Sequence, residues 1–453
     1  MNYRVQGGMP LSGSVATNIS KNASVAMLAG SLLNRGTTTL KNMPRIEEVN
    51  RLVEVLESIG VSVEWKESGL PAATGLSERS SRSGAAQAGD MVIAPPYELD
   101  LKNINKESAR RTRSIALFIG PITHWLDEFE LPMPGGCNLG DRSMAAHVYA
   151  LAKMGIKVGE GEGGMFRVDA RDKHAADIVM LEASDTGTEN VLLAAAKLPG
   201  KTTIRFASVN YMVQDVCVFL EQLGVRVEGI GTHELVVHGA PDIDDDIDGY
   251  PSEDPVEAMF FLSLAATTHS AITIERAPID FLELELITLE NMGLQYERGD
   301  TYTAANGHTR LVDIHTKPSE FTAPLEKIAP RPYPGINIDN LPFFVPVATQ
   351  AKGRTLIHDW VYENRAPYYM EINKLGGDLV LADVHRVFVN GPTELQPAEV
   401  VCPPALRPAT LLLIGMLAAK GESTLYNVYP INRGYENLHS RLAGLGAKID
   451  ALG

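Results

Sequence analysis

The 453-residue chain has few cysteines and no long apolar run. Its three cysteines, Cys137, Cys217 and Cys402, are odd in number and widely separated, which argues against a disulfide framework and for a reducing compartment. No apolar run approaches the roughly 20 residues that a membrane helix needs, and the N-terminus lacks the apolar core of a secretion signal. We therefore expect a cytoplasmic protein that has no membrane partner.

Positive charge is scarce as well, because 40 lysines and arginines stand against 56 aspartates and glutamates, for a formal net charge of −16 at pH 7. A chain this acidic is a poor partner for nucleic acid. It contains no HExxH motif, no paired CxxC motifs and no Walker lysine, so metal catalysis and P-loop chemistry have no support. We expect neither a metal nor a cofactor. If the substrates are anionic, the charge that binds them has to be local.

Residues 159–164 formally match the dinucleotide fingerprint GxGxxG. The next residues, 165–168, continue as a strand instead of a helix, and the two glutamates inside the run would repel a pyrophosphate. We therefore interpret this run as the tip of a β-hairpin.

The most informative feature that is present is an internal repeat. A helix that ends in Leu, Met or, at Gly60, Ile, followed by Gly and then by a strand, occurs six times. The closing glycines are Gly60, Gly155, Gly224, Gly293, Gly376 and Gly446. A glycine just past a helix end adopts a left-handed conformation that satisfies the last helical carbonyls. Each copy is preceded by another helix and strand. The pattern therefore predicts six βαβ-type units.

The preceding helices are apolar almost all round, which predicts that they are buried inside their domain. They are expected over residues 23–33, 115–125, 191–198, 260–267, 345–351 and 411–419. Six units over this length suggest an α/β protein of two domains with three units each, and a boundary in the acidic stretch 241–255. The Ser-, Ala- and Gly-rich stretch 68–89 is predicted to be a long hairpin loop.

Cys137 lies on a glycine-rich bend, in the run 132–142, which ends at Arg142. The bend separates a predicted strand, 129–131, from a predicted helix, 143–154. A thiol near a helix N-terminus and an arginine has a lowered pKa. Cys137 is therefore a candidate nucleophile or proton donor, and a buried loop cysteine is the alternative. Cys217 and Cys402 are interpreted as structural.

Several basic residues stand at junctions between predicted elements, where helix N-termini already favour anions. They are Lys21, the group 110–113, Arg365, Arg407 and Arg433. In an acidic protein this arrangement predicts a site for phosphate and carboxylate groups. Asp339 is the carboxylate that stands in an otherwise apolar–polar loop before a buried helix. It is a candidate general base, and a helix N-cap is the alternative.

Taken in chain order, these motifs resemble those of UDP-N-acetylglucosamine enolpyruvyl transferases. The matching motifs are Lys21-Asn22, the Pro-Gly-Gly-Cys loop with Arg142, residues 332–335 followed by Asp339, Glu363-Asn364-Arg365 and residues 433–436. The related enolpyruvylshikimate-phosphate synthase type shares the fold, the lysine and the arginines but lacks the Pro-Gly-Gly-Cys loop. The resemblance covers the whole chain.

The resemblance implies an α/β fold of two inside-out, barrel-like domains, each of three repeats with buried helices and outer sheets. One domain would span residues 21–250 and carry Cys137. The other would combine residues 1–20 with 251–453 and carry Asp339, Arg407 and Arg433. The N-terminal strand would then belong with the C-terminal half of the chain.

The resemblance also implies an activity: transfer of the enolpyruvyl group of phosphoenolpyruvate to a hydroxyl of UDP-N-acetylglucosamine, with release of phosphate. This is the first committed step of peptidoglycan precursor synthesis. Addition and elimination at an enol ether needs proton transfer to carbon, proton removal from oxygen and fixed positive charge around phosphate. No metal is required.

The same resemblance assigns residues to roles. Cys137 would act on phosphoenolpyruvate or in product release and would be alkylated by fosfomycin, and Asp339 would take the proton from the acceptor hydroxyl. The groups that would hold phosphate and carboxylate are Lys21, Arg113, Arg142, Arg407 and Arg433. The other implied substrate-binding residues are Asn22, which would contact the acceptor, Arg365, which would lie near Asp339, and His147 and Ser184.

The chain departs from the family pattern largely at acceptor-side or structural positions. Ala405 and Asn432 replace aspartates, residues 209–212 replace an acidic–proline stretch, and residues 143–147 differ from the usual Pro-x-Asp-Leu-His. Two alternatives follow: the same chemistry on another acceptor, such as a uridine nucleotide in specialised metabolism, or a non-catalytic paralogue that binds nucleotide sugars. Retention of Cys137, Lys21 and Asp339 speaks against the second.

Overall fold

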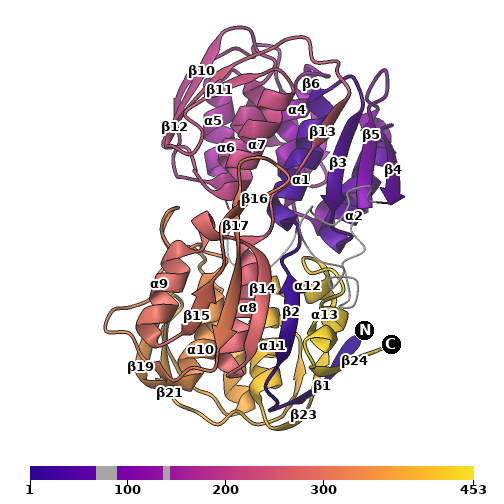
Figure 1. The fold of residues 1–453 in the computed structure, drawn as a ribbon. Coiled ribbons are helices and arrows are strands. Elements are labelled where there is room, and N and C mark those ends of the chain that lie inside the picture. Colours follow the sequence, from indigo (N-terminus) through magenta and orange to yellow (C-terminus); the bar gives the residue numbers. More distant parts are fainter. Residues whose placement is uncertain (68–88, 136–142) are drawn as a thin grey trace.

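The computed structural model describes residues 1–67, 89–135 and 143–453. Cys137, Arg142 and most of the predicted hairpin loop lie outside these ranges. Figure 1 shows two lobes, in each of which helices lie between sheets. The first lobe is drawn in indigo to magenta, and the second in orange to yellow together with the indigo N-terminal strands.

The first lobe carries three sheets. Their strands, in spatial order, are β13 (Ile247–Gly249), β3 (Thr38–Met43), β5 (Gly89–Ala94) and β4 (Ser62–Glu67); β6 (Glu128–Pro132), β8 (Met165–Asp169) and β7 (Lys157–Glu160); and β11 (Arg226–Glu228), β12 (Glu234–His238), β10 (Lys201–Arg205) and β9 (Asp177–Val179). The antiparallel pairing of β7 with β8 makes residues 161–164 a hairpin tip, as predicted.

The second lobe carries the other three sheets. Their strands, in spatial order, are β22 (Glu399–Val401), β23 (Gly421–Tyr426), β1 (Asn2–Gly7) and β24 (Lys448–Leu452); β15 (Gln295–Arg298), β17 (Arg310–Lys317), β14 (Ala271–Pro278) and β2 (Ser12–Ala16), with β16 (Tyr302–Thr303) beside β17; and β18 (Phe321–Thr322), β19 (Ala351–His358), β21 (Arg386–Gly391) and β20 (Asp378–Asp383).

The predicted repeat is visible in the pairing of the strands. In five sheets one outer strand runs parallel to its neighbour, and the other pairs are antiparallel. The parallel strand is the first of the order in three of these sheets and the last in two. The sheet of β6, β8 and β7 has only the antiparallel pairs. All six closing glycines have the predicted positive φ, from 75° at Gly155 to 119° at Gly293.

The apolar helices form the interior of each lobe, as predicted. They are α1 (Lys21–Gly30) with η1 (Ser31–Leu33), η4 (Ser114–Phe118) with α4 (Ile119–Ile122), α6 (Asp185–Ala195), α8 (Pro255–Thr267), η6 (Leu341–Phe343) with α10 (Phe344–Gln350), and α11 (Leu406–Ala418). All thirteen residues of α8 are buried. A helix of this kind is stable only inside a core, because it has no polar face for water.

In the chain, each helix that a glycine closes follows an interior helix and a strand, and it precedes another strand. They are α2 (Glu47–Ser58), α5 (Ala145–Lys153), α7 (Tyr211–Gln222), α9 (Glu283–Met292), η7 (Ala366–Leu375) and α13 (Leu438–Gly444). Short helices join other elements: η3 (Leu101–Asn103), α3 (Lys106–Arg111), η5 (Ile279–Phe281) and α12 (Tyr429–Asn432).

Two helix predictions need correction. Residues 115–125 do not form one continuous α-helix, because η4 is a 3₁₀-helix and α4 ends at Ile122. Pro121 lacks the N–H that would bond to the carbonyl four residues earlier, which disfavours a regular α-helix here. The helix expected at 191–198 begins six residues earlier, at Asp185, where the Ser184 side chain caps it.

The chain passes between the lobes at two neighbouring places. Strands β1 and β2 pair with strands of the C-terminal half, as predicted, and the chain then enters α1 of the first lobe. It returns between β13 and α8. The two passing segments contact each other, since Ser20 N donates to Ser252 O at 2.8 Å and Asp254 N to Asn18 O at 2.8 Å.

Each lobe has its own hydrophobic core. One core is built from residues between Ala23 and Ile243, and the other from residues between Tyr3 and Val15 together with residues between Val256 and Ile449. On this basis we propose two domains, 21–250 and 1–20 plus 251–453. Helices α1 and α8 then begin where the two domains meet. The candidate site residues lie in the same region.

Candidate active site

Asp339 faces two buried arginines of the second lobe. Its Oδ1 lies 3.8 Å from Arg365 Nη1, and its Oδ2 lies 3.5 Å from Arg407 Nη2. The Asp339 side chain keeps 25% of its surface exposed, whereas both arginine side chains are buried. Asp339 is not the N-cap of η6, because Asn340 takes that position. The carboxylate is therefore held in a positive environment and remains within reach of solvent.

Arg365 is held in place from behind by Asp359. Arg365 Nε donates to Asp359 Oδ2 at 2.6 Å and Nη2 donates to Oδ1 at 2.9 Å, a bidentate arrangement. The hydroxyl of Tyr369 donates to the same Asp359 Oδ2 at 2.5 Å. Asp359 is fully buried. This fork leaves Nη1 as the nitrogen nearest to Asp339.

Arg407 belongs to the first turn of α11 and lies next to a second buried carboxylate, Asp254. Arg407 Nη1 donates to the Tyr435 hydroxyl at 3.1 Å. Asp254 is the N-cap of α8, where it accepts from Val256 N at 2.8 Å. Burial raises the pKa of Asp254 to about 6, although the charge of Arg407 acts in the opposite direction.

Glu48 of α2 interacts with residues of both lobes. Arg433 Nη2 of the second lobe donates to Glu48 Oε2 at 3.0 Å, and the Thr112 hydroxyl donates to Oε1. Burial on its own would raise the pKa of Glu48, but the charges of Lys21 and Arg433, with the bond from Thr112, lower it. Glu48 is therefore an anion that interacts with two predicted phosphate-binding cations.

Glu48 was not found by the sequence analysis. It is an ordinary-looking acid in the first turn of an amphipathic helix. Its burial, at 4% exposure, and its partner 385 positions away are properties of the tertiary structure alone.

His147 and Ser184 lie together at the N-terminus of α6. The Ser184 hydroxyl accepts from Gly187 N at 3.2 Å. His147 Nδ1 lies 3.1 Å from the Asn190 amide nitrogen, so the neutral ring carries its proton on Nε2, which is 3.1 Å from the Thr186 hydroxyl. Burial, and then the charge of Arg113, lower the pKa of His147 to about 4. The ring is therefore uncharged at neutral pH.

Asn22 lies at the N-terminus of α1 and contacts a tyrosine from the departing stretch 209–212. Asn22 Nδ2 donates to the Tyr211 hydroxyl oxygen at 3.4 Å, and the Ser20 hydroxyl donates to the same oxygen at 3.1 Å. Tyr211 is buried, and burial raises its pKa well above the ordinary value. The phenol is therefore neutral.

Two further buried acids lie on α6. Asp185 accepts from the Ser208 hydroxyl at 2.5 Å and from the Asn210 amide at 3.2 Å. Glu189 is 1% exposed, and burial together with Asp185 and Asp215 raises its pKa well above the usual range. Lys21 acts on Glu189 in the opposite direction. Both acids follow Ser184 in the sequence, but no motif marked them.

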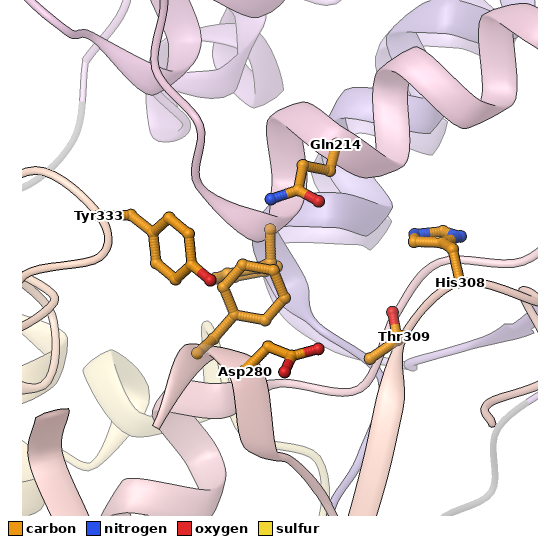
Figure 2. A pocket seen from close by; sticks show the side chains of 7 residues that line it. Gln214, Asp280, His308, Thr309 and Tyr333 are labelled. Carbon is orange, nitrogen blue, oxygen red and sulfur yellow. The ribbon is translucent and has the colours of Figure 1, made fainter. Parts of the chain in front are cut away.

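A cavity of about 90 Å³ lies beside Tyr211, between residues of the two lobes. Figure 2 shows Gln214 projecting into it from a helix, with His308 and Thr309 on one side and Tyr333 on the other. The remaining lining residues are Tyr211, Asp280 and Phe281. His308 Nε2 contacts Asp215 Oδ1 of α7 at 2.9 Å, so a loop of the second lobe reaches the first.

The predicted residues thus form two neighbouring groups. One contains Asp339, Arg365 and Arg407, and the other contains Lys21 and Arg433 around Glu48. Arg113 belongs to neither group: its charge acts on His147, and Arg113 Nη2 donates to Ser143 O at 3.4 Å. Cys137 and Arg142 lie outside the described residues, so their predicted roles stay predictions.

The other two cysteines are core residues. Cys217 and Cys402 are 1% and 5% exposed. Burial raises the pKa of both thiols, that of Cys402 to about 12. These observations agree with the structural role predicted for them.

Within residues 1–67, 89–135 and 143–453, no group of three or more His, Cys, Asp or Glu side chains is arranged to hold a metal ion. No helix in the same ranges is both long and apolar enough to span a bilayer.

Comparison with known proteins gives consistent results for sequence and fold. A family model described as EPSP synthase (3-phosphoshikimate 1-carboxyvinyltransferase) matches residues 5–442. The chain is 32% identical to the UDP-N-acetylglucosamine 1-carboxyvinyltransferase of Bradyrhizobium diazoefficiens over 99% of this chain and 97% of that protein.

Solved structures share the fold. The enolpyruvyl transferase NikO from Streptomyces tendae is similar with a TM-score of 0.82 and 22% identity over 99% of this chain and 98% of that chain. An EPSP synthase from Acinetobacter baumannii gives a TM-score of 0.72 and 17% identity over 99% and 100%. The predicted two-lobed α/β fold is confirmed.

Proposed function

Because the chain belongs to the EPSP synthase family and is an enolpyruvyl transferase, we propose that its acceptor is UDP-N-acetylglucosamine. The reaction would move the enolpyruvyl group of phosphoenolpyruvate to a sugar hydroxyl and release phosphate, the first committed step of peptidoglycan precursor synthesis. The support is the name of the relative from Bradyrhizobium diazoefficiens, which is similar over nearly its whole length.

The proposed binding of phosphoenolpyruvate rests on fixed positive charge. Lys21 and Arg433 lie around Glu48, and Arg407 lies at the N-terminus of α11. An anionic substrate that displaces the contact between Arg433 and Glu48 would gain a cation that the fold has already positioned. Arg113 and Arg142 would complete the set.

The proposed chemistry is an addition followed by an elimination. In the first step Asp339 takes the proton of the acceptor hydroxyl. The oxygen of that hydroxyl forms a bond to C2 of phosphoenolpyruvate, and C3 gains a proton. In the second step the bond from C2 to the phosphate oxygen breaks, C3 loses a proton, and the vinyl ether and phosphate leave. Cys137 is the proposed proton donor or release group. General acid–base steps of this kind contribute about 10²–10⁴-fold each.

The observation that carries the proposed chemistry is the position of Asp339. Its carboxylate is part-exposed, and two buried arginines lie within 4 Å of its oxygens. A base in this position can receive a proton from a hydroxyl while the same arginines attract the anionic donor.

A second candidate function is the same chemistry on another acceptor, such as a uridine nucleotide. The observation that favours it is Tyr211, which belongs to the departing stretch 209–212 and contacts Asn22. Asn22 is the residue proposed to contact the acceptor, so a change beside it bears on acceptor choice.

The test is phosphate release from phosphoenolpyruvate with UDP-N-acetylglucosamine, UMP or shikimate 3-phosphate as acceptor. We expect turnover with UDP-N-acetylglucosamine and a loss of about 10²–10⁴-fold in Asp339→Asn. Asp383→Asn is the matched control, because that carboxylate pairs with Arg386 on the surface of the same lobe. Turnover with UMP alone would move the protein to the second candidate. Full activity of Asp339→Asn would remove Asp339 as the base.

A further inference from the structure

We propose that Tyr211 is a positioning residue that orients the Asn22 side chain for the acceptor. This inference rests on the proposed function, in which Asn22 contacts the acceptor. It extends that function, because it assigns a role in acceptor binding to a residue of the stretch in which the chain departs from its family.

The hydrogen bonds at the Tyr211 hydroxyl determine the direction of each donor. The Ser20 hydroxyl donates to the Tyr211 oxygen at 3.1 Å, and Ser20 Oγ itself accepts from Ala23 N at 3.3 Å as the cap of α1. The Asn22 amide nitrogen, at 3.4 Å, gives the second proton to the same oxygen. With the amide N–H₂ group directed at Tyr211, the Asn22 carbonyl oxygen has a defined direction.

A carbonyl oxygen with a defined direction suits a substrate donor. An acceptor that carries hydroxyl or amide N–H groups, as a nucleotide sugar or a nucleoside does, can donate to it. In both of these bonds the Tyr211 oxygen is the acceptor, and its own O–H has no acceptor among the residues that the structure describes. The phenol therefore retains one donor at the same place.

The Tyr211 ring is held by residues of the other lobe. Its centroid lies 5.7 Å from that of Phe281 in an edge-to-face arrangement, and Phe281 in turn packs against Tyr333 at 4.9 Å. Phe281 and Tyr333 belong to the second lobe, whereas Tyr211 begins α7 of the first. A tyrosine packed in this way offers Asn22 a fixed hydrogen-bond acceptor. Asn22 is then already oriented before the acceptor binds, so it loses little further conformational entropy on binding.

The Tyr211 phenol interacts electrostatically with residues of the candidate site. Asp254, Asp339 and Arg407 all act electrostatically on Tyr211, so the hydroxyl lies in the same neighbourhood as the candidate base. The neutral phenol keeps its hydrogen-bond pattern across the pH range in which Asp339 would work.

The test is a double-mutant cycle between Tyr211→Phe and Asn22→Ala, read by steady-state phosphate release. Phe keeps the ring contact with Phe281 and removes only the hydroxyl. We expect the acceptor KM to rise about five- to tenfold, the size of one lost hydrogen bond, with kcat and the phosphoenolpyruvate KM within twofold of wild type. In the Asn22→Ala background, Tyr211→Phe should add nothing, because the residue it acts through is absent.

Other outcomes would overturn the inference. Multiplying losses in the double variant would mean that Tyr211 acts independently of Asn22. Equal losses in kcat and both KM values, together with a lowered thermal midpoint, would mean that the hydroxyl has only a structural role.

The wild type separates this inference from the proposed function. If wild type turns over UMP and not UDP-N-acetylglucosamine, the proposed acceptor is wrong and the cycle is measured with UMP. If wild type turns over the sugar nucleotide but Tyr211→Phe leaves its KM unchanged, only the inference is wrong. If neither nucleotide is an acceptor, both are wrong.

Discussion

At the scale of single residues, buried charges determine how the candidate site is arranged. Arg365 reaches Asp339 because Asp359 holds the opposite side of the guanidinium, and Arg433 is held by Glu48. Neither carboxylate belongs to a recognisable motif. A buried ion pair of this kind contributes to geometry more reliably than to net stability, since both groups lose their hydration.

Removing Asp359 should therefore destabilise the protein strongly. In Asp359→Ala the Arg365 guanidinium stays buried without its main partner, and we expect the free energy of unfolding to fall by about 3–5 kcal/mol. Urea unfolding followed by circular dichroism measures this change. Asp383→Ala, which breaks the exposed pair with Arg386, is the control and should leave the midpoint nearly unchanged. Equal midpoints for the two variants would contradict the structural role of Asp359.

At the scale of the element, the helix-closing glycines are the most regular feature of the chain. All six adopt the positive φ that the repeat predicted, but their surroundings differ. A Cβ added at Gly293 would lie 2.2 Å from the Glu320 carbonyl oxygen, whereas a Cβ at Gly446 would have no atom within 4 Å.

This difference predicts unequal effects of the same substitution. Gly446→Ala meets only the backbone strain of a positive φ, and we expect a loss of about 1–2 kcal/mol. Gly293→Ala adds a clash with backbone that precedes β18, so the loss should be larger, about 3 kcal/mol or more. Thermal unfolding of both variants measures the order, and a larger loss in Gly446→Ala would show that local strain outweighs the clash.

Some elements could be predicted from the sequence pattern, and others could not. The interior helices and the strands after them were predictable, because apolar periodicity and glycine caps are local properties. The 3₁₀ geometry of η4 and the early end of α4 at Ile122 were missed, since the apolar pattern continues through both. The parallel strand of the first sheet in the first lobe is β13, residues 247–249, which is far in sequence from its neighbour β3. No local pattern could predict this pairing.

At the scale of the whole molecule, polar contacts connect the lobes. The side chain of His308, from the segment between β16 and β17, contacts Asp215 of α7 at 2.9 Å. Asp215 also accepts from Ser252 N and Ser252 Oγ, and Glu253 acts on the same histidine. Burial on its own would lower the pKa of His308, but the bond to Asp215 and its charge raise it.

The stability of the molecule should therefore depend on pH through His308. Since the pKa of His308 is raised in the folded state, its contribution is complete below the ordinary value of about 6.5 and is lost as pH rises through the folded value. We expect the free energy of unfolding of wild type to be higher than that of His308→Gln, and this difference to be about 1 kcal/mol larger at pH 6 than at pH 9. Urea unfolding at both pH values measures this, and a difference between the variants that is independent of pH would contradict the ion pair.

The sequence by itself determined the repeat, the closing glycines, the buried helices and the set of basic residues at element junctions. Each of these depends on the side chains and backbone of a short stretch, so it can be read without knowing the contacts. It also supplied the resemblance on which the roles proposed for Cys137 and Asp339 depend.

Only the tertiary structure decided which charges meet. Glu48 and Arg433 are 385 positions apart, Ser20 and Tyr211 are 191 apart, and His308 and Asp215 are 93 apart. Contacts at these separations depend on how the six units pack around two cores, and no periodicity within a unit encodes them. The partners of the candidate site residues are consequently properties of the fold, whereas the identities of those residues are properties of the chain.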